Sequence, residues 1–281
     1  MDASERRVTV VGPDDRTAEI RRAIDDVAGR VGDASPTTTA TEAPSDAADA
    51  AVVVTVGRAA LRDTVAAAPT GTVIPVGRDR FALDVGRLKD VLSRGFAAAP
   101  ATADPAAPDS NDAVDAALAP VDGVRRATHP VLAVDGTSAS PRAVFDVAFV
   151  TDSPARISEF AIEFAYGTPA TFRADGVVVA TPLGSAGYAN AAGAPVVEPG
   201  GGLAVTPIAP FRTQTDSWIA ASELTVTVKR EEEPVALVVD GAKRELVEPN
   251  RPTAIEAVDR VDLVVAIPGS ERDDRKHSNN S

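Results

Sequence analysis

One stretch, residues 174–190 with the sequence ADGVVVATPLGSAGYAN, constrains the fold of this chain most. The β-branched run Val177–Val179 predicts a buried strand, because such side chains pack well on a pleated surface. Pro182 lacks a backbone donor and therefore ends the strand. The next positions are mostly small residues and include Gly184, Ser185, Gly187 and Tyr188. Such a strand, turn and short helix can present backbone N–H groups to an anion or to the polar edge of a ligand. Glycines that only supply unusual dihedrals would give the same pattern.

The first hundred residues alternate apolar runs with segments of helical periodicity. The predicted strands cover residues 7–11, 51–56 and 71–76, and the predicted helices cover 17–31, 59–67 and 85–96. Residues 32–48 are rich in Ser, Thr, Pro and Asp, and we expect a solvated loop there. The alternation favours a parallel sheet covered by helices on both faces, that is, a three-layer α/β/α domain.

From residue 124 the chain changes to closely spaced strands. A loop or linker at 97–111 and a short helix at 112–118 come before this change. Strands are predicted at 130–134, 144–150, 157–164, 171–173, 177–180, 203–208, 224–228, 235–239 and 261–267. Few helices interrupt them, which indicates a β-sandwich-like domain. We therefore expect an α/β plus β fold, with an α/β domain at 1–123, a β-rich domain at 124–268 and a disordered tail at 269–281.

The chain is acidic and poor in lysine, with a formal net charge of −13 over 281 residues. Because charge repulsion is screened over roughly 3 Å in 1 M salt, we expect a salt-adapted protein. An acidic surface disfavours nucleic-acid binding, which needs a basic face. No apolar run reaches membrane-spanning length, and the first residues lack the apolar core of a signal peptide, so we expect a cytoplasmic protein.

Residues that usually bind metals are scarce. The chain has no cysteine, which excludes disulfides and thiolate metal sites. Its two histidines are His129, which precedes a proline and is interpreted as structural or solvated, and His277, which lies in the polar tail. We predict no protein-bound metal site.

The segment from Asp175 to Tyr188 resembles a signature of the NAD kinase family, whose usual form is DG-x4-TPTGSTAY. Further matches occur in the order of the family: residues 153–160 to an entering strand, 193–197 to GGPIV, 206–210 to TPI-x-P, and 235–241 to a late strand with a DG turn. The resemblance covers residues 145–241 and says much less about the first 130 residues.

The resemblance implies an activity and a set of ligands. NAD kinases transfer the terminal phosphoryl group of ATP, sometimes of polyphosphate, to the 2′-hydroxyl of the adenosine ribose of NAD. We therefore expect NAD(H)/NADP(H) and ATP with Mg²⁺ as ligands, and a homodimer or homotetramer, since relatives complete their sites across subunits. The positions that match dinucleotide contacts are Asp175, Gly184, Ser185 and Tyr188. Tyr188 can stack on a base or ring, and an Asp-Gly turn would explain Asp175 without a ligand.

One catalytic motif of the family is missing. Its GGDGT segment should come directly after the predicted strand 51–56, where backbone amides approach phosphate and the aspartate takes the proton of the attacking hydroxyl. This chain reads Gly57-Arg58-Ala59-Ala60-Leu61-Arg62, and the aspartate position falls on Gly57, or on Arg58 in a register shifted by one. Neither residue can act as a base. Asp63 lies just beyond and is a candidate substitute, although a helical position facing water explains it equally.

Further departures affect the ribose and the signature itself. The Asn-Glu pair of the family, which holds ribose hydroxyls, becomes Phe145-Asp146. Asp146 can still bond a hydroxyl, or it can be a solvated carboxylate at a strand end. Within the signature Leu183, Ala186 and Gly187 replace Thr, Thr and Ala, and the arginine expected after TPI-x-P falls on Asp216.

Three hypotheses are consistent with these residues. The chain is an active, divergent NAD kinase in which Asp146 or Asp63 serves the hydroxyl, or it is a non-catalytic nucleotide-binding or regulatory paralogue. The third is a related phosphotransferase that acts on a different hydroxyl.

Overall fold

A computed structural model describes residues 7–31, 37–48, 50–97, 121–153, 157–211, 216–230 and 234–267. Most of the predicted linker at 97–111, the predicted helix at 112–118 and the predicted tail at 269–281 lie outside these residues. Contacts divide the chain into two compact units. The first unit comprises Met1–Ala127 and Asp262–Ser281, and the second comprises Thr128–Val261. The predicted domain boundary at residue 124 differs slightly from this division.

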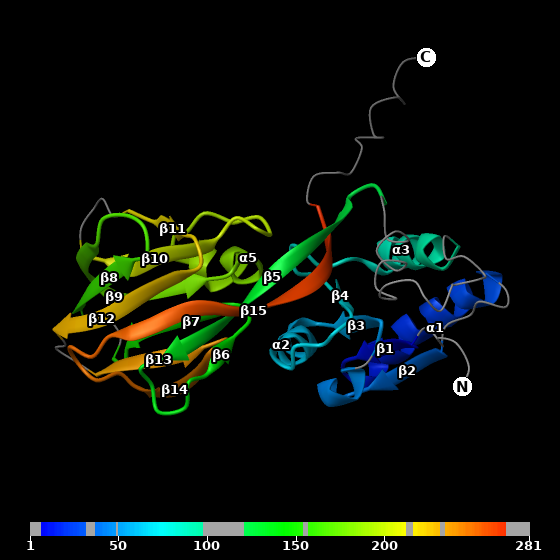
Figure 1. Ribbon diagram of the computed structural model, residues 1–281, viewed down its shortest axis with the longest axis horizontal. Coiled ribbons are helices and arrows are strands. Elements are labelled where there is room, and N and C mark those ends of the chain that lie inside the picture. The colour runs from blue at the N-terminus through cyan, green and yellow to red at the C-terminus, as the bar shows by residue number, and fades with distance from the viewer. Residues whose placement is uncertain are drawn as a thin grey trace, which may run out of the picture. The chain divides into compact units, whose positions relative to one another are not determined.

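The first unit contains a parallel sheet (Figure 1). Its strands are β1 (Arg7–Val11), β2 (Thr37–Thr41), β3 (Val52–Val56) and β4 (Thr72–Val76), in the order β2-β1-β3-β4. The end of β15 (Thr253–Ala266) joins this sheet, because Leu263 pairs in parallel with Val73 of β4. The fold therefore assigns the last residues of β15 to the first unit, whereas the sequence placed residues 261–267 in the second domain.

Helices cover both faces of this sheet. Helices α1 (Asp14–Val31) and α3 (Val85–Ala97) pack on each other and share one apolar cluster with alternate residues of the strands. Helix α2 (Arg58–Ala66) packs against β3 and the 3-10 helix η1 (Pro44–Ala47), and it buries Leu61 and Val65 outside that cluster. Because side chains of a strand alternate between faces, this arrangement is the predicted α/β/α layering.

One expectation for this unit is wrong. Residues 32–48 were expected to form a solvated loop, but β2 and η1 lie within them. The strand has the sequence TTTAT and pairs with β1 alone, at the edge of the sheet. Threonine is β-branched and suits an edge strand with one solvated face, and Thr39 Oγ1 bonds Thr9 Oγ1 at 3.0 Å. Without a large apolar side chain this strand resembles a polar loop in sequence.

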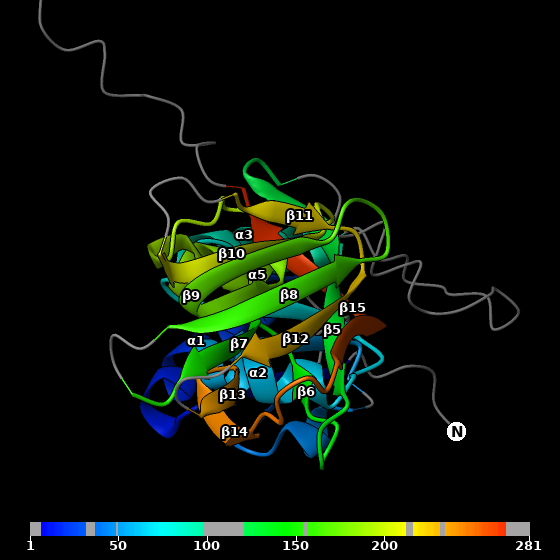
Figure 2. The same cartoon turned by 90° about the vertical axis from the view of Figure 1, so that its left-hand side faces the viewer.

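The second unit is built from antiparallel strands around β9 (Ala170–Ala180) (Figure 2). Its other strands are β5 (Val124–Asp135), β6 (Arg142–Ala143), β7 (Asp146–Thr151), β8 (Ser158–Phe164), β10 (Leu203–Pro210), β11 (Trp218–Ala220), β12 (Glu223–Arg230), β13 (Val235–Val239) and β14 (Ala242–Leu246), with the start of β15. The first part of β9 pairs with β8, its second part pairs with β7, and β10 pairs along its other edge. Strand β9 thus belongs to both layers of the unit.

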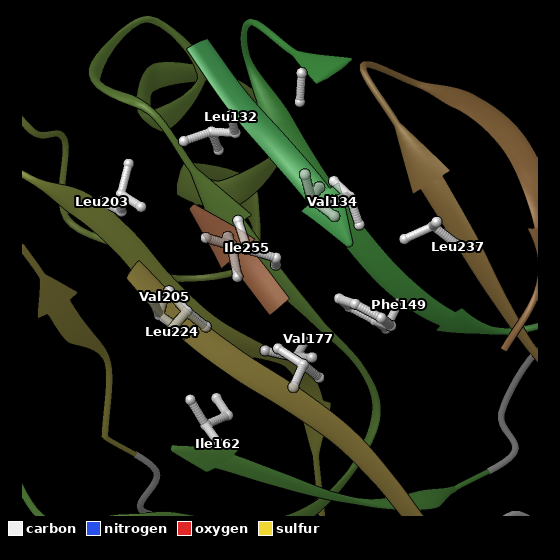
Figure 3. Packing of buried hydrophobic residues seen from close by; sticks show 14 of the residues in the cluster. Leu132, Val134, Phe149, Ile162, Val177, Leu203, Val205, Leu224, Leu237 and Ile255 are labelled. Atoms are coloured by element: carbon white, nitrogen blue, oxygen red, sulfur yellow. The ribbon is translucent and has the colours of Figure 1, made fainter. Parts of the chain in front are cut away.

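The core of the second unit lies between these layers (Figure 3). Phe149 and Leu237 come from the layer of β7 and β13, whereas Ile162, Leu224 and Ile255 come from the layer of β8, β12 and β15. All five side chains are buried. The predicted α/β plus β fold, with a β-sandwich-like second part, is confirmed.

Candidate functional site

The strand break at Thr181-Pro182 forms a tight corner against the start of β7. Strand β9 ends at Ala180, and the short helical turns α5 (Pro182–Gly184) and η2 (Ser185–Ala189) come next. Thr181 caps this turn, since its Oγ1 accepts from the Gly184 N–H at 3.3 Å. The same hydroxyl donates to the carbonyls of Val144 at 2.8 Å and Phe145 at 3.1 Å. The corner is therefore attached to the segment that enters β7.

Gly184 and Ser185 hold this corner in place. A Cβ atom on Gly184 would lie 1.9 Å from the carbonyl oxygen of Phe145, so a larger residue cannot occupy the position without moving the backbone. Ser185 is fully buried; its Oγ donates to the Pro182 carbonyl at 2.8 Å and accepts from the Val197 N–H at 2.9 Å. These contacts give both residues a structural role, and a direct ligand contact from either stays a prediction.

Two of the predicted ligand-binding carboxylates, Asp146 and Asp175, act electrostatically on a third predicted residue, Tyr188. Asp146 is the first residue of β7, lies 6% exposed and pairs in register with Ala180 at the end of β9. Asp175 is half-buried in β9, and Tyr188 on η2 is 47% exposed. Partial burial raises the pKa of the Tyr188 phenol, and the charges of Asp146 and then Asp175 raise it further. The site thus combines two carboxylates with an accessible aromatic hydroxyl.

Asp175 does not sit in a turn. Strand β9 runs without interruption through Asp175 and Gly176, which were expected to separate two strands. Gly176 is required there for close packing, because a Cβ atom would lie 2.3 Å from the carbonyl oxygen of Phe149. The Asp-Gly turn offered as an explanation without a ligand is therefore wrong, and the dipeptide marks a close approach between two strands.

Sequence reasoning missed the part played by Asp240. Its carboxylate accepts three consecutive backbone N–H bonds, from Val144 at 2.9 Å, Phe145 at 2.7 Å and Asp146 at 3.0 Å. The residue comes directly after β13 and has a φ of +49°, in the left-handed region that Asp tolerates better than most residues. The Asp-Gly pair after an apolar run was the available signal, but it was interpreted only as a turn.

Two other candidate residues lie in the first unit. Gly57 precedes α2 with a φ of +88°, which favours glycine, and its N–H donates to the Val76 carbonyl at 3.0 Å. Asp63 lies on α2, where its carboxylate pairs with Arg62 at 2.7 Å on the surface. This geometry agrees with the solvent-facing interpretation of Asp63. The structure describes each unit by itself, so it does not bring these residues to the site of the second unit.

No group of three or more His, Cys, Asp or Glu side chains that could hold a metal ion occurs within the described ranges. None of the helices in those ranges combines the length and apolar character that a membrane span requires.

The second half of the chain is similar to a known protein family. The profile described as the ATP-NAD kinase C-terminal domain matches residues 146–266. The NAD kinase of Methanosarcina mazei is 35% identical over 107 residues, which are 37% of this chain and 37% of the relative. The NAD kinase of Methanospirillum hungatei is 38% identical over 101 residues, 35% of this chain and 38% of the relative. The match thus spans little more than a third of these curated relatives.

Two solved structures share the fold along most of the chain. The NAD kinase of Archaeoglobus fulgidus in complex with ATP superimposes with a TM-score of 0.62 at 20% identity, covering 92% of each chain. Yeast NADH kinase complexed with NADH gives a TM-score of 0.63 at 15% identity, covering 99% of this chain and 90% of the other. The fold, the matched profile and the signature around Thr181-Pro182 agree, and residues 146–266 are identified as an ATP-NAD kinase C-terminal domain.

Proposed function

We propose that this chain binds an NAD-type dinucleotide, NAD(H) or NADP(H), at Asp146, Asp175 and Tyr188. The observation that carries this proposal is that the charges of Asp146 and Asp175 both act on Tyr188, within the segment that matches the family profile. A carboxylate accepts hydrogen bonds from ribose hydroxyls or from an amide group. A half-exposed tyrosine offers a flat face on which a base or ring can stack. Gly184 and Ser185 support the binding by holding the corner against β7.

We further propose slow transfer of a phosphoryl group from ATP to the bound dinucleotide. Mg²⁺ would arrive with ATP as part of the substrate, because this ion is commonly held by phosphates together with few protein carboxylates. Asp146 would orient the attacking hydroxyl and accept its proton. The position that matches the GGDGT aspartate holds Gly57 or Arg58. Because Asp146 would serve the hydroxyl from a different position, we expect a reduced turnover, with about 10²–10⁴, the usual contribution of a positioned base, as the upper bound of the loss.

A second candidate function is favoured by the same substitution. Gly57 and Arg58 cannot accept a proton at neutral pH, and Asp63 is paired with Arg62 on the surface. A chain with this motif suits a non-catalytic nucleotide-binding or regulatory paralogue, which would bind the dinucleotide without converting it.

Two measurements on the purified full chain separate these functions. NAD, ATP and Mg²⁺ are incubated with the protein in concentrated KCl and NADP is assayed, while NAD and NADP binding are followed by calorimetry. NADP formation supports the slow kinase, and binding without turnover supports the paralogue. If neither NAD nor NADP binds, the proposed function is wrong in both forms.

Restoring the missing acid tests whether the rest of the site is competent. Gly57→Asp or Arg58→Asp should raise the rate of NADP formation by about 10²-fold or more if the lost carboxylate limits turnover. Gly77→Asp is the matched control, since Gly77 comes after the neighbouring strand β4 at the position that Gly57 has after β3. An equal increase in all three variants would contradict a specific role for the motif position.

The remaining expectations concern the state of the protein. We propose a cytoplasmic, salt-adapted protein that forms a homodimer or homotetramer and does not bind nucleic acid. The net charge of −13 supports the adaptation to salt and disfavours a nucleic-acid partner.

A further inference from the structure

The three residues Val144, Phe145 and Asp146, here called the entry segment, are fixed through their backbones from several sides. Their N–H groups all donate to the carboxylate of Asp240. On the carbonyl side, Thr181 donates to Val144 and Phe145, and the Asp240 N–H donates back to the Asp146 carbonyl at 2.9 Å.

We call the three hydrogen bonds from the entry segment to Asp240 the clamp. Their strength comes from the charge of the Asp240 carboxylate. An ionised carboxylate offers about four lone-pair positions on two oxygens and forms stronger hydrogen bonds than a neutral acceptor. Oδ1 accepts from Phe145 and Asp146, whereas Oδ2 accepts from Val144. Asparagine at this position would present one acceptor and one N–H₂ group, which would face a backbone donor. Only a carboxylate satisfies the three amides together.

The clamp holds the backbone of Asp146 and does not bond its side-chain carboxylate. The entry segment ends at Asp146, whose side chain is 6% exposed and influences Tyr188. Because Asp240 bonds the backbone of Asp146 on both its N–H and its carbonyl, a change at Asp240 moves the Cα atom from which this carboxylate projects.

We propose that Asp240 is the positioning residue of the site, and that it sets the place of the Asp146 carboxylate by binding the three amides of the entry segment. Its role in ligand binding rests on the proposed function, whereas its control over Asp146 does not. Asp240 itself does not contact the ligand in this proposal. Its contribution to binding therefore passes entirely through Asp146.

The first test monitors Tyr188 and needs no ligand. The chain has two tyrosines, Tyr166 and Tyr188, so Tyr166→Phe leaves the phenol of Tyr188 as the single tyrosine signal in an ultraviolet pH titration. In this background Asp146→Asn should lower the pKa of Tyr188, because one of the charges that raise it is removed. Asp240→Asn should lower it too. Asp240→Asn added to Asp146→Asn should give no further decrease.

A matched control distinguishes positioning from a general loss of stability. Glu245 also accepts a backbone N–H, from Ser138 at 3.0 Å, but it does not bond the entry segment. Glu245→Gln should lower the melting temperature without moving the Tyr188 titration. The inference is overturned if Asp240→Asn leaves the titration unchanged, or if its effect is as large in the Asp146→Asn background.

The second test uses NAD affinity. Asp240→Asn should weaken NAD binding about tenfold or more, the scale of losing hydrogen bonds to a charged group. In the Asp146→Asn background it should have no effect on NAD affinity, although it still lowers the melting temperature. If the parent chain binds no NAD, the proposed function fails, and the Tyr188 titration still decides the inference. If the parent binds NAD and Asp240→Asn weakens it equally in both backgrounds, positioning through Asp146 is refuted.

Discussion

Acid should destabilise the second unit through His129. This histidine is 1% exposed, and its Nε2 lies 2.8 Å from the Val144 carbonyl oxygen, which fixes Nε2 as the protonated nitrogen of the neutral ring. The other nitrogen, Nδ1, is buried without a hydrogen-bond partner in the part of the chain that the structure describes. Protonation would place a charge and an unpaired donor in the interior. Burial accordingly lowers the pKa of His129 from 6.5 to about 4.

The size and sign of the effect are given by linkage. Above pH 6.5 the ring is neutral in both the folded and the unfolded chain, so it makes no pH-dependent contribution. As the pH falls from 6.5 to 4, the unfolded chain binds a proton that the folded chain excludes, and the free energy of unfolding decreases. A pKa difference from 6.5 to about 4 corresponds to about 3 kcal/mol at 1.36 kcal/mol per unit. That is a large part of the 5–15 kcal/mol typical of a domain.

The measurement is urea unfolding at constant KCl between pH 8 and pH 4. Trp218, the single tryptophan, packs between Phe164 and Phe172 in the second unit, so its fluorescence reports the unfolding of that unit. His129→Gln retains an N–H donor for the Val144 carbonyl and does not titrate. The stability difference between parent and variant should change by about 3 kcal/mol across this range. Parallel pH profiles, or an imidazole NMR titration near pH 6.5, would refute the reasoning.

Three further predictions concern the corner and the surface. Gly184→Ala should destabilise the second unit by about 1–3 kcal/mol or more, because its Cβ would lie 1.9 Å from the Phe145 carbonyl oxygen. The control Gly77→Ala, whose Cβ meets nothing within 4 Å, should be nearly neutral. Equal losses of stability in urea unfolding would contradict the steric argument. Ser185→Ala should cost about 1–3 kcal/mol by leaving the buried Val197 N–H without its acceptor, and an unchanged urea midpoint would show that the bond contributes little. The melting temperature should rise as KCl is increased from low to multimolar concentration, because the net charge of −13 repels itself less; a flat dependence in a calorimetric scan would rule out adaptation to salt.

The strands that sequence predicted best are those with β-branched apolar runs. The strand predicted at Val235–Val239 has the same bounds as β13. Valine dominates this run, and the structure buries four of its five residues. Strand β2 escaped prediction since its threonines gain their stability from an edge position beside β1, and sequence does not reveal which strand will be a neighbour. Strand β9 was divided in two because Asp-Gly is a common turn signal, and only the proximity of Phe149 explains the glycine inside a strand.

The sequence predicted which residues form the candidate site, but not which of them bind a ligand and which hold the structure. Asp146, Asp175 and Tyr188 were predicted as ligand-binding residues; both carboxylates act electrostatically on Tyr188, and the contact of all three with a ligand stays a prediction. Ser185 was given the same role, and its full burial with backbone partners could not be known before the corner was seen. Asp240 was missed because its partners are backbone amides nearly a hundred positions earlier. Almost every residue has a backbone amide, so the sequence does not show which amides a side chain will bind.

The path of β9 has a consequence for how the second unit comes apart. One continuous strand forms hydrogen bonds with β8 along its first half and with β7 and β10 along its second half. A layer can detach only when all of its hydrogen bonds to this strand break, so partial opening at this junction requires the loss of one complete set of bonds. The amide hydrogens of Val177, Val178 and Val179 should consequently be among the slowest in the protein to exchange with deuterium.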